Sequence, residues 1–504
     1  MDPRHTSSQS IRAIERESFL EQARDLMGTG ARLVFMYATD DRATRAGFSV
    51  NAVFDAHSEG FVTLRALVPA ADPTYPSLAS HIMAAHWYER LIHDQFGIVA
   101  QGHPDWRRLV HHENIPAKTH PLRKDFAWNT ALAHTHEPYP MHAVEGKGVY
   151  EIPVGPIHAG IIEPGHFRFN VRGERILTLE GKLFFTHKGV EKLVEGKTPA
   201  EALPFVERIS GDGAVGHALA FCEAVERATG TQVPDRAREL RVLWLELERV
   251  GAHLFDLGNM GGMGTGFTFM AAQCFRMLED MRLLYASLTG HRFLRGAVMP
   301  GGAHDLDTVG LGRILAALDA LEPDISRVLD IAYATDGLME RFETTGVLTK
   351  DAALAYGARG VPARASGVDI DMRRDHPTAA YKTFAPHVPT KTPGDVRARF
   401  STRVIELAES IRLIRAVADK LTKGPAHVPL AAKPGESLGW CESFRGAIID
   451  FVCLDEKGRI ERLAVSDPSF MNWALFGELG PGNIVPDFPL CNKSLNLSYS
   501  GTDL

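Results

Sequence analysis

Apolar residues recur every three or four positions in four long segments of the chain: Asp235–Leu257, Gly266–Leu288, about 309–330 and about 394–422. This spacing places the apolar side chains of each segment on one face of an α-helix. The stripe of the first segment consists of Leu240, Leu243, Leu247, Val250, Leu254 and Leu257. Helices of this length gain most of their stability by packing such stripes together. We therefore expect a bundle of long helices.

Strand-like runs dominate the N-terminal part of the chain. Arg32–Tyr37, Phe48–Phe54 and Gly60–Val68 are rich in β-branched and aromatic residues and are separated by turn residues. The apolar pattern over 11–27 predicts a short amphipathic helix before these strands. Tyr75–Phe96 predicts a second helix after them. Together these elements indicate a small α+β domain.

A second group of strand-like runs precedes the long helices. It comprises Val149–Val154, His166–Val171, Arg175–Glu180 and Leu183–Phe185, with a hairpin turn at Arg172–Glu174. Short strands return over 430–470, after the last long helix. The fold class expected for the whole chain is α+β, with an antiparallel sheet packed on the long-helix bundle.

Composition and periodicity divide the chain into four parts. Residues 1–10 are polar and Ser-rich, and we expect them to be disordered. The α+β domain covers 11–126. Residues 127–148 lack periodicity and are rich in Trp, Thr, His, Pro and Gly, which predicts a linker. The sheet and the long helices form a second domain over 149–504.

Charge and cysteine content exclude several classes of protein. The net charge of -7 over 504 residues, with basic residues only in short pairs, argues against a nucleic-acid partner. None of the five cysteines forms a C-x-x-C pair, so no iron–sulfur or zinc site is encoded locally. No apolar run reaches the ~18 residues that a membrane span requires, and no signal peptide is evident. Any membrane association is therefore expected to come through partners.

Two stretches far apart in the chain share the pattern Ser, two residues, Gly. Glu207–His217 contains Ser210 and Gly213 and is expected to form a tight Gly-rich turn that leads into a helix. Asn496–Leu504 contains the second pair, Ser498 and Gly501, at the end of the sequence. A third notable stretch runs from Gly155-Pro156-Ile157-His158 to Glu163-Pro164-Gly165-His166-Phe167-Arg168.

Together the three stretches resemble the large subunit of membrane-bound, energy-converting [NiFe]-hydrogenases. In that family the two Ser/Gly stretches read R-x-C-G-x-C and D-P-C-x-x-C, and their four thiolates hold nickel and iron. Here the four positions are occupied by Ser210, Gly213, Ser498 and Gly501. A neutral hydroxyl is a poor ligand for such a centre, and glycine has no side chain. The resemblance therefore implies a hydrogenase-like chain without the metal ligands, as in the quinone module of respiratory complex I.

A second resemblance lies in the N-terminal part, in Tyr88–Ile98, Gly102–Leu109 and His120–Phe126. These stretches resemble the C-type subunit of complex I and the matching domain of formate hydrogenlyase large subunits, so the chain looks like a fused C/D-type protein. They hold no nucleophile–base pair. A salt-bridged docking segment against a neighbouring subunit is therefore favoured over a catalytic role.

The resemblance implies a site where the sheet, the Gly-rich turn and the C-terminal tail converge. Its candidate catalytic residues are His158, Glu163, His166, Asp212 and Arg445, and its candidate acceptor-binding residues are Ser210, Gly213, Ser498, Tyr499 and Gly501. Glu163 is either a proton relay with a raised pKa or the cap of a turn. His158 either donates a proton to a quinone oxygen or is a residue shared with hydrogenases that reduce no quinone.

Two further candidates also have structural interpretations. Asp212 either binds protons or a cation in the emptied metal cavity or, the favoured interpretation, caps the following helix. Arg445 lies in Glu442–Gly446, which resembles the family's E-x-P-R-G with Phe444 in place of Pro. It either lies over the acceptor or forms a structural ion pair. Arg364–Gly367 and the charged residues up to Arg374 are expected to form a salt network.

The function implied is that of a subunit of a complex I-like or hydrogenase-related oxidoreductase. The chain would form the cavity for an electron acceptor, with a quinone as the expected acceptor, beside the [4Fe–4S] cluster of a partner that resembles the iron–sulfur small subunit (B-type) of complex I. It would bind no cofactor alone, lie peripherally on the cytoplasmic face of the inner membrane, and couple to antiporter-like membrane subunits. Gly261–Gly266 lacks the ending of a phosphate loop, so any NADH would bind another subunit. The alternatives are an active [NiFe]-hydrogenase and a non-catalytic docking scaffold.

Overall fold

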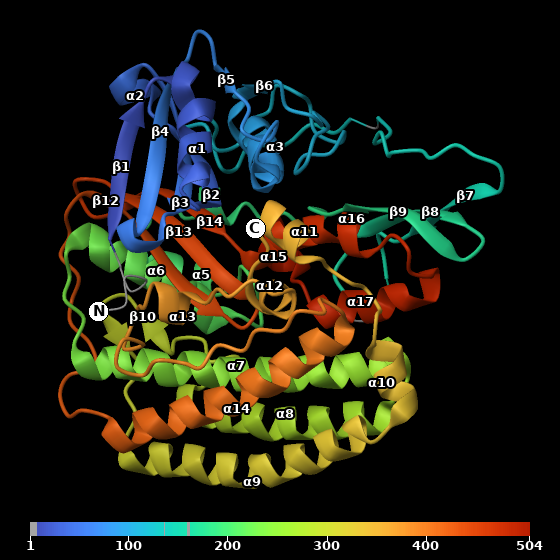
Figure 1. Cartoon of the computed structure of the whole chain (residues 1–504). Helices are drawn as coiled ribbons and strands as arrows, with labels where there is room; N and C mark the ends of the chain where they lie inside the picture. The colour runs from blue at the N-terminus through green and yellow to red at the C-terminus, as the bar shows by residue number, and fades with distance from the viewer. Residues whose placement is uncertain (1–7, 136, 159–161) are drawn as a thin grey trace.

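The computed structural model describes residues 8–135, 137–158 and 162–504. Its elements form layers: the N-terminal sheet lies against a C-terminal sheet, and the long helices lie on the far side of that second sheet (Figure 1). The expected α+β class is confirmed, with a small N-terminal sheet domain beside a larger part built on long helices.

The N-terminal sheet has four strands in the order β1-β4-β3-β2. They are β1 (Gln9–Ile14), β2 (Arg32–Asp40), β3 (Gly47–Asp55) and β4 (Phe61–Pro69). The three predicted strands are confirmed as β2, β3 and β4, which pair antiparallel. The helices of this domain include α1 (Phe19–Gly28), the short α2 (Arg42–Arg45) and α3 (His86–Phe96).

The prediction of one helix over 11–27 is wrong at its start. Ile11 and Ile14 have helical spacing, but they belong to β1, which pairs in parallel with the edge of β4. Pairing there satisfies backbone groups that β4 would otherwise leave open at the edge of the sheet. Helix α1 begins only at Phe19. Residues 1–7 lie outside the described part, and residues 9 and 10 already belong to β1.

The predicted helix Tyr75–Phe96 is confirmed only in its second half, as α3. Tyr75 belongs to the short strand β5 (Thr74–Pro76), which pairs with β6 (Val99–Gln101). The buried carboxylate of Glu89 accepts hydrogen bonds from the Ser77 hydroxyl at 2.6 Å and from the Leu78 amide at 2.7 Å. These bonds hold the intervening loop against α3 and compete with helix formation.

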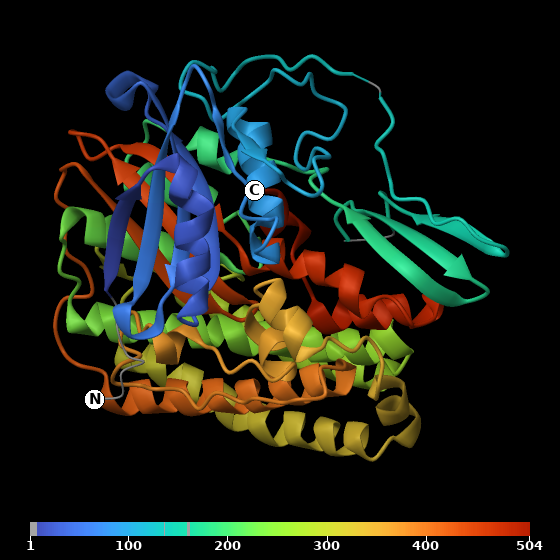
Figure 2. The ribbon, with the colours of Figure 1, turned by 45° about the horizontal axis from the view of Figure 1, so that its top comes forward.

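A three-stranded antiparallel sheet extends away from the N-terminal domain (Figure 2). It contains β7 (Val149–Val154), β8 (His166–Arg172) and β9 (Arg175–Lys182), and Gly173 has the positive φ of 62° that the hairpin turn requires. The three predicted strands are confirmed, but the fourth, Leu183–Phe185, is wrong. Phe184 has a φ of 66°, and its amide donates at 2.7 Å to the carboxylate of Asp503 near the C-terminus.

The four long helices are confirmed, and a shorter one, α6, precedes them. Their bounds are α6 (Ala214–Thr229), α7 (Asp235–Thr265), α8 (Thr268–Thr289), α9 (Thr308–Tyr333) and α14 (Val396–Lys420). Helix α7 packs against both α8 and α14, and α9 covers the outside of α8 (Figure 1). The predicted stripe from Leu240 to Leu257 is fully buried.

The C-terminal sheet joins the two parts of the molecule. Its antiparallel strands are β12 (Gly435–Ser443), β13 (Gly446–Leu454) and β14 (Ile460–Ser466). One face packs on α6, so closely that a Cβ at Gly439 would lie 2.1 Å from the carbonyl oxygen of Ala220. The other face meets the N-terminal sheet, where the rings of Tyr37 and Phe451 stack at 4.3 Å.

Short elements complete the chain and position the site. They are α4 (Val190–Leu193), α5 (Pro199–Val206), β10 (Val298–Met299), β11 (Gly302–Ala303), α10 (Asp336–Phe342), α11 (Lys350–Ala355), α12 (Gly360–Ala365), α13 (Met372–Asp375), α15 (Pro468–Asn472), α16 (Phe476–Leu479), α17 (Phe488–Leu495) and α18 (Tyr499–Asp503). Across the ranges described, none of the helices combines the length and the apolar character needed to span a bilayer.

Candidate functional site

The two Ser/Gly pairs, almost three hundred residues apart, meet in the folded chain. The Ser210 and Ser498 hydroxyl oxygens lie 2.9 Å apart, and both side chains are buried. Ser210 lies in the turn between α5 and α6, and Ser498 caps α18 by accepting the Gly501 amide at 2.8 Å. The Gly213 amide donates to the Ser210 carbonyl at 3.0 Å, which closes the predicted tight turn. The convergence expected from the resemblance is therefore present.

The two glycines of the site differ in the space around them. A Cβ at Gly213 would have its nearest neighbours at 3.7 Å and beyond, which is ordinary contact. A Cβ at Gly501 would lie 2.5 Å from a carboxylate oxygen of Asp467. Asp467 in turn lies 3.0 Å from the His217 ring, and both are buried. A side chain at Gly501, including that of cysteine, would therefore require the Asp467 carboxylate to shift.

These residues do not fit a nickel–iron centre. Two hydroxyls bond to each other, two positions lack side chains, and soft thiolate ligands are missing from all four positions. Among the described residues, no group of three or more His, Cys, Asp or Glu side chains is arranged to hold a metal ion.

The strongest charged contact of the site joins Asp212 to Arg445. The guanidinium donates to both carboxylate oxygens, at 2.8 and 2.7 Å, and also to the Asn496 carbonyl at 2.6 Å. Burial raises the pKa of Asp212, but the attraction and hydrogen bonds of Arg445 outweigh burial and lower it to about 2. Because 35% of the Asp212 side chain stays exposed, solvent screens part of this attraction. The carboxylate is ionised at neutral pH.

The favoured interpretation of Asp212 as a helix cap is wrong. Gly213 occupies the cap position of α6, and no side chain of the cap residue bonds to the helix. The amides of Val215 and Gly216 instead donate to the carboxylate of Glu248 on α7, at 2.7 and 3.0 Å. Asp212 is thereby left to pair with Arg445. The structural ion pair proposed for Arg445 is confirmed, with Asp212 as its partner.

The hairpin before β8 brings Glu163 to the C-terminal helix α18. Its carboxylate accepts the Ser500 amide at 2.7 Å, and burial raises its pKa. His158 and His166 bond to the backbone of the same hairpin, His158 to the Gly165 carbonyl at 2.8 Å and His166 to the Gly155 carbonyl at 3.2 Å. Residues 159–161 lie outside the described part.

Tyr499 lies beside this hairpin. Its ring is 4.8 Å from that of Trp473 and packs so closely on Gly165 that a Cβ there would lie 2.5 Å away. His158 bonds to the carbonyl of the same glycine, so Tyr499 and His158 meet at Gly165. Burial raises the pKa of Tyr499 to about 12, so it remains a protonated phenol at neutral pH.

Three buried acids near the site belong to no motif singled out in the sequence. Asp467 pairs with His217, and Asp256 on α7 accepts from Arg403 at 2.8 Å and from the side chain of Asn496. Glu248 caps α6. Asp256 lies off the apolar stripe of α7, on a face that the periodicity marks as polar, so the sequence pattern did not indicate its burial.

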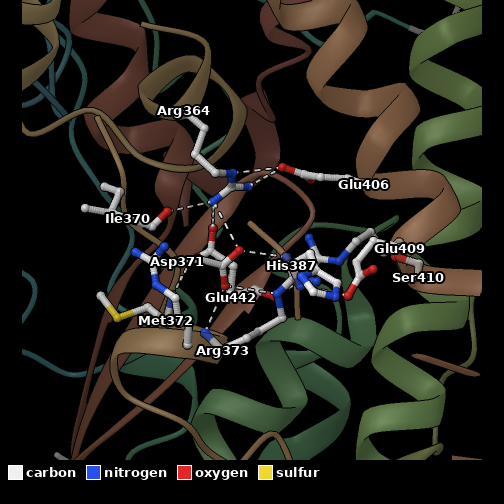
Figure 3. Close-up of polar contacts among 12 residues, drawn as sticks. Arg364, Ile370, Asp371, Met372, Arg373, His387, Glu406, Glu409, Ser410 and Glu442 are labelled. Atoms are coloured by element: carbon white, nitrogen blue, oxygen red, sulfur yellow. Dashed lines mark hydrogen bonds and ion pairs between the residues drawn. The ribbon is translucent and has the colours of Figure 1, made fainter. Parts of the chain in front are cut away.

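The predicted salt network around Arg364 is confirmed (Figure 3): Arg364, Asp371 and Arg373 are buried, whereas Arg374 pairs with the exposed Asp369. Arg364 donates to Glu406 at 2.8 Å and to Glu442 at 2.7 Å. Arg373 binds Asp371 at 2.7 Å and Glu246 on α7 at 3.1 Å. These contacts connect α12 and α13 to α7, α14 and β12. The network therefore stabilises the packing of these elements around the site.

The charged N-terminal segment also forms its bonds within the chain. Buried Asp94 accepts from Arg108 at 3.1 Å and from the amide of Val110 at 2.8 Å. Arg90 donates to the carbonyl oxygens of Arg107 and Arg108 at 2.6 and 3.0 Å. The segment is salt-bridged as expected. Docking to a neighbouring subunit stays a prediction.

Comparison with known protein families matches three parts of the chain. Residues 12–131 match the 30 Kd subunit of respiratory-chain NADH dehydrogenase, and residues 263–433 match its 49 Kd subunit. Residues 188–257, which include the Gly-rich turn, match nickel-dependent hydrogenase. The three matches follow one another along the chain in the order expected of a fused protein.

Individual proteins show the same relationship. Formate hydrogenlyase subunit 5 of Escherichia coli (strain K12) is 31% identical over 484 residues, covering 94% of this chain and 85% of that protein. The C/D 2 subunit of NADH-quinone oxidoreductase from Aquifex aeolicus (strain VF5) is 28% identical over 499 residues, covering 86% of this chain and 85% of that one.

Among solved structures, a chain of the membrane-bound sulfane sulfur reductase, an archaeal respiratory membrane complex, superposes with a TM-score of 0.67 and 25% identity. That match covers 73% of this chain and all of the other. The fold, the meeting of the two Ser/Gly pairs and the sequence matches all indicate the same family. The chain is an oxidoreductase subunit and belongs to the family that joins the large subunits of formate-hydrogenlyase-type [NiFe]-hydrogenases with the fused C/D subunits of NADH-quinone oxidoreductase.

Proposed function

We propose that this chain is a peripheral subunit of a membrane-associated respiratory complex and forms the cavity in which an electron acceptor, a quinone, is reduced. The observation that carries the proposal is the replacement of four thiolates by a hydrogen-bonded serine pair and two glycines, beside an ion pair of Asp212 and Arg445. A site of this kind offers hydrogen bonds and charge but no metal-binding sulfur. It suits a substrate that takes up electrons and protons at its oxygen atoms.

Relatives support the assembly part of the proposal. The family includes subunits of NADH-quinone oxidoreductase, and the matched structure is that of an archaeal respiratory membrane complex. On this basis the chain lies against the cytoplasmic face of the inner membrane, next to antiporter-like subunits whose ion translocation is coupled to electron transfer. Ile157, 86% exposed in the connection between β7 and β8, would offer one apolar contact for a membrane-embedded neighbour.

Electrons would come from a [4Fe–4S] cluster in a partner that resembles the iron–sulfur small subunit of complex I. Four arginines lie on neighbouring elements: Arg208 in the turn before α6, Arg282 on α8, and Arg292, which pairs with Glu279 at 2.6 Å, and Arg295 in the loop after α8. Burial lowers the pKa of Arg295 and repulsion by Arg208 lowers it further, whereas the carboxylate of Glu207 acts in the opposite direction. A cluster held by four thiolates carries net negative charge, which would be attracted to these arginines.

Reduction of a quinone to a quinol consumes two electrons and two protons. The positive charge of Arg445 would stabilise negative charge that develops on a quinone oxygen. Glu163 holds a proton more firmly than an ordinary carboxyl and lies on the hairpin that carries His158, so either residue would serve as a proton donor. Tyr499 would donate a hydrogen bond to the quinone from its protonated phenol.

Metal analysis and quinone reduction by the purified complex test the proposal. We expect no stoichiometric nickel, no hydrogen evolution, and reduction of decylubiquinone by the reduced complex. Glu163→Gln and His158→Gln should each slow this reduction at least tenfold. Glu151→Gln, an exposed carboxylate on the same hairpin, is the matched control and should leave the rate unchanged.

Two results would contradict the proposal. Stoichiometric nickel together with hydrogen evolution would establish an active hydrogenase. Unchanged electron transfer in both Glu163→Gln and His158→Gln would favour a docking scaffold without a role in the chemistry.

A further inference from the structure

A small cavity adjoins the candidate site on the side of the long helices. Its volume is about 30 Å³, and it lies between α7 and α8, with Phe444 from the turn between β12 and β13 in its lining. A volume above roughly 15 Å³ is enough for one ordered water molecule. The ionisable residues that line it are Asp212, Glu248, Asp256, Arg282, Tyr285 and Arg292.

The lining of this cavity leads from the interior to the surface. Glu248 at its inner end is 6% exposed, whereas the side chain of Arg292 at its outer end is 43% exposed. Asp212 lines the cavity and binds Arg445 of the candidate site at the same time. Water in the cavity would therefore lie between bulk solvent, Glu248 and the site.

Glu248 is held in place without a cationic partner. Its two carboxyl oxygens accept the amides of Val215 and Gly216, at 2.7 and 3.0 Å, at the first turn of α6. Within the part of the chain that the structure describes, it forms no ion pair. The nearby guanidinium of Arg249 is turned to the carbonyl oxygens of Glu442 and Ser443, at 2.6 and 3.0 Å.

The groups around Glu248 favour its protonated form. Burial raises its pKa to about 8 and the charge of Asp212 adds to this effect, whereas the two amides and Arg249 act in the opposite direction. From α8, Tyr285 and Arg282 face the same cavity, and from β12 the thiol of Cys441 lies near, with a pKa raised by burial. Asp212 across the cavity remains ionised because of Arg445. A protonated carboxyl, that of Glu248, and an ionised one, that of Asp212, therefore line the same cavity.

We propose that Glu248 holds a proton and supplies it, through water in this cavity, to the acceptor bound at the Asp212–Arg445 site. The inference rests on the proposed function for the identity of the acceptor. In the step, the O–H bond of the Glu248 carboxyl breaks and the proton passes by way of water to a reduced acceptor oxygen. Glu248 becomes a carboxylate and regains a proton from solvent through the outer end of the cavity. Two electrons from the partner and two protons in total convert the quinone to a quinol.

A purely structural role for Glu248 makes a different prediction. If its only task were to cap α6, glutamine would replace it, because an amide oxygen also accepts from backbone amides. Glutamine carries no exchangeable acid proton at these pH values. The substitution Glu248→Gln therefore separates capping from proton supply.

Infrared spectroscopy of the full-length chain tests the first half of the inference. Glu248→Gln should remove one band from the C=O stretching region of protonated carboxylic acids, a band that in the unsubstituted protein shifts in D₂O and fades as the pH rises through about 8. Asp450→Asn is the matched control: Asp450 is a fully buried carboxyl with a raised pKa that does not line this cavity. It should remove a different band. Loss of no band in Glu248→Gln overturns the inference.

Decylubiquinone reduction by the assembled complex tests the second half. We expect Glu248→Gln to slow it at least tenfold below pH 8, Glu248→Asp to restore part of the rate, and Asp450→Asn to leave it unchanged. A rate in Glu248→Gln equal to that of the unsubstituted complex overturns the inference and leaves the proposed function intact. An unsubstituted complex that reduces no quinone but keeps the infrared band contradicts the proposed function instead.

Discussion

At the scale of residues, the ion pair of Asp212 and Arg445 lies beside Ser210, one of the four positions where hydrogenases have metal-binding thiolates. The Arg445 guanidinium donates to both oxygens of the Asp212 carboxylate and to the Ser210 hydroxyl. The charge of Arg445 is thereby retained next to the site while its geometry is fixed by three acceptors. The contribution of this pair to the stability of the fold can be measured directly.

Arg445→Met should lower stability in a pH-dependent way. The folded-state pKa of Asp212, about 2, lies below the ordinary value of 3.8, so the pair stabilises the fold above pH ~4 and loses this effect as the pH falls toward 2. We expect a loss of about 1–2 kcal/mol at pH 7 and about a third of that at pH 2.5, where a carboxyl with a pKa of about 2 is still mostly ionised, after allowance for the exposed part of Asp212. Chemical denaturation across this pH range measures it.

The double variant Asp212→Asn/Arg445→Met provides the control for this measurement. It leaves no unpaired charge, so it should recover part of the loss and show little dependence on pH between 2.5 and ~5. An equal loss at both ends of the pH range in the single variant would contradict the assignment of the pair.

The two glycines at former ligand positions should respond differently to cysteine. At Gly501 a Cβ would meet the Asp467 carboxylate at 2.5 Å, whereas at Gly213 the nearest atoms are 3.7 Å away. We therefore expect Gly501→Cys to cost about 2–3 kcal/mol through overpacking and disturbance of the Asp467–His217 pair. Gly213→Cys should cost under ~1 kcal/mol. Thermal unfolding of the two variants compares them, and equal losses would contradict this account of the packing.

At the scale of elements, the long helices were predictable because the stripe from Leu240 to Leu257 repeats over several turns and has one interpretation. Strand β1 was not predictable, because the spacing of Ile11 and Ile14 also suits a helix. The segment forms a strand only because it pairs with the edge of β4, which is distant in sequence. The fourth strand failed for the same reason: Phe184 is held by Asp503 at the other end of the chain. A local sequence pattern does not indicate which distant residue will contact it.

The same limit applies to the site, where contacts between distant parts of the chain could not be predicted from local patterns. The meeting of Ser210 and Ser498 could be predicted only through the resemblance, since nothing in either stretch alone points to the other. An ion pair for Arg445 was expected, but its partner was taken for a helix cap because Asp212 precedes α6. Glu248 lies outside every motif, and its role at the start of α6 follows only from the packing of α7 against α6.

The network around Arg364 should be essential for the packing of these elements. Arg364→Met leaves Glu442 buried without its cation and Glu406 with only the His253 ring, at 3.0 Å, a situation that costs about 3–5 kcal/mol. Arg327→Met on the surface of α9, where the side chain is 74% exposed, is the control and should stay within ~0.5 kcal/mol. Urea denaturation followed by far-UV circular dichroism compares them. A loss below ~1 kcal/mol in Arg364→Met would show that the remaining groups rearrange to satisfy both acids.

At the scale of the whole molecule, the N-terminal sheet and the C-terminal sheet share one apolar core. The ring of Phe61 lies 4.6 Å from that of Trp440, and Tyr37 stacks on Phe451. The buried pair of His376 and Asp55, at 2.9 Å, crosses the same interface, as does the bond from Arg359 to the Val34 carbonyl. The interface resembles the interior of a single domain more than a contact between mobile domains.

This continuity predicts how the chain behaves when its linker is cut. Over 127–148, the described residues form no helix or strand, and Trp128 is 70% exposed, so the peptide bonds there are accessible to proteases. Since the buried interface does not depend on the linker, fragments 1–126 and 149–504 should remain associated and elute together in size-exclusion chromatography at pH 7. Relatives that correspond to the D-type subunit alone match about two thirds of this chain, which accords with a non-covalent interface between the two parts.

The cut chain also provides a measure of the interface. Burial raises the pKa of Asp55, but His376 and Arg32 outweigh it and hold the pKa well below its ordinary value, so the pair stabilises the interface above pH ~4 and fails as the pH falls. The fragments should therefore separate at acid pH before either unfolds, and Tyr37→Ala, which removes the stacked ring, should separate them at a higher pH. Leu67→Ala, an exposed residue of β4, should behave like the unsubstituted protein. Separation at pH 7 without any substitution would mean that the linker, and not the shared core, holds the two sheets together.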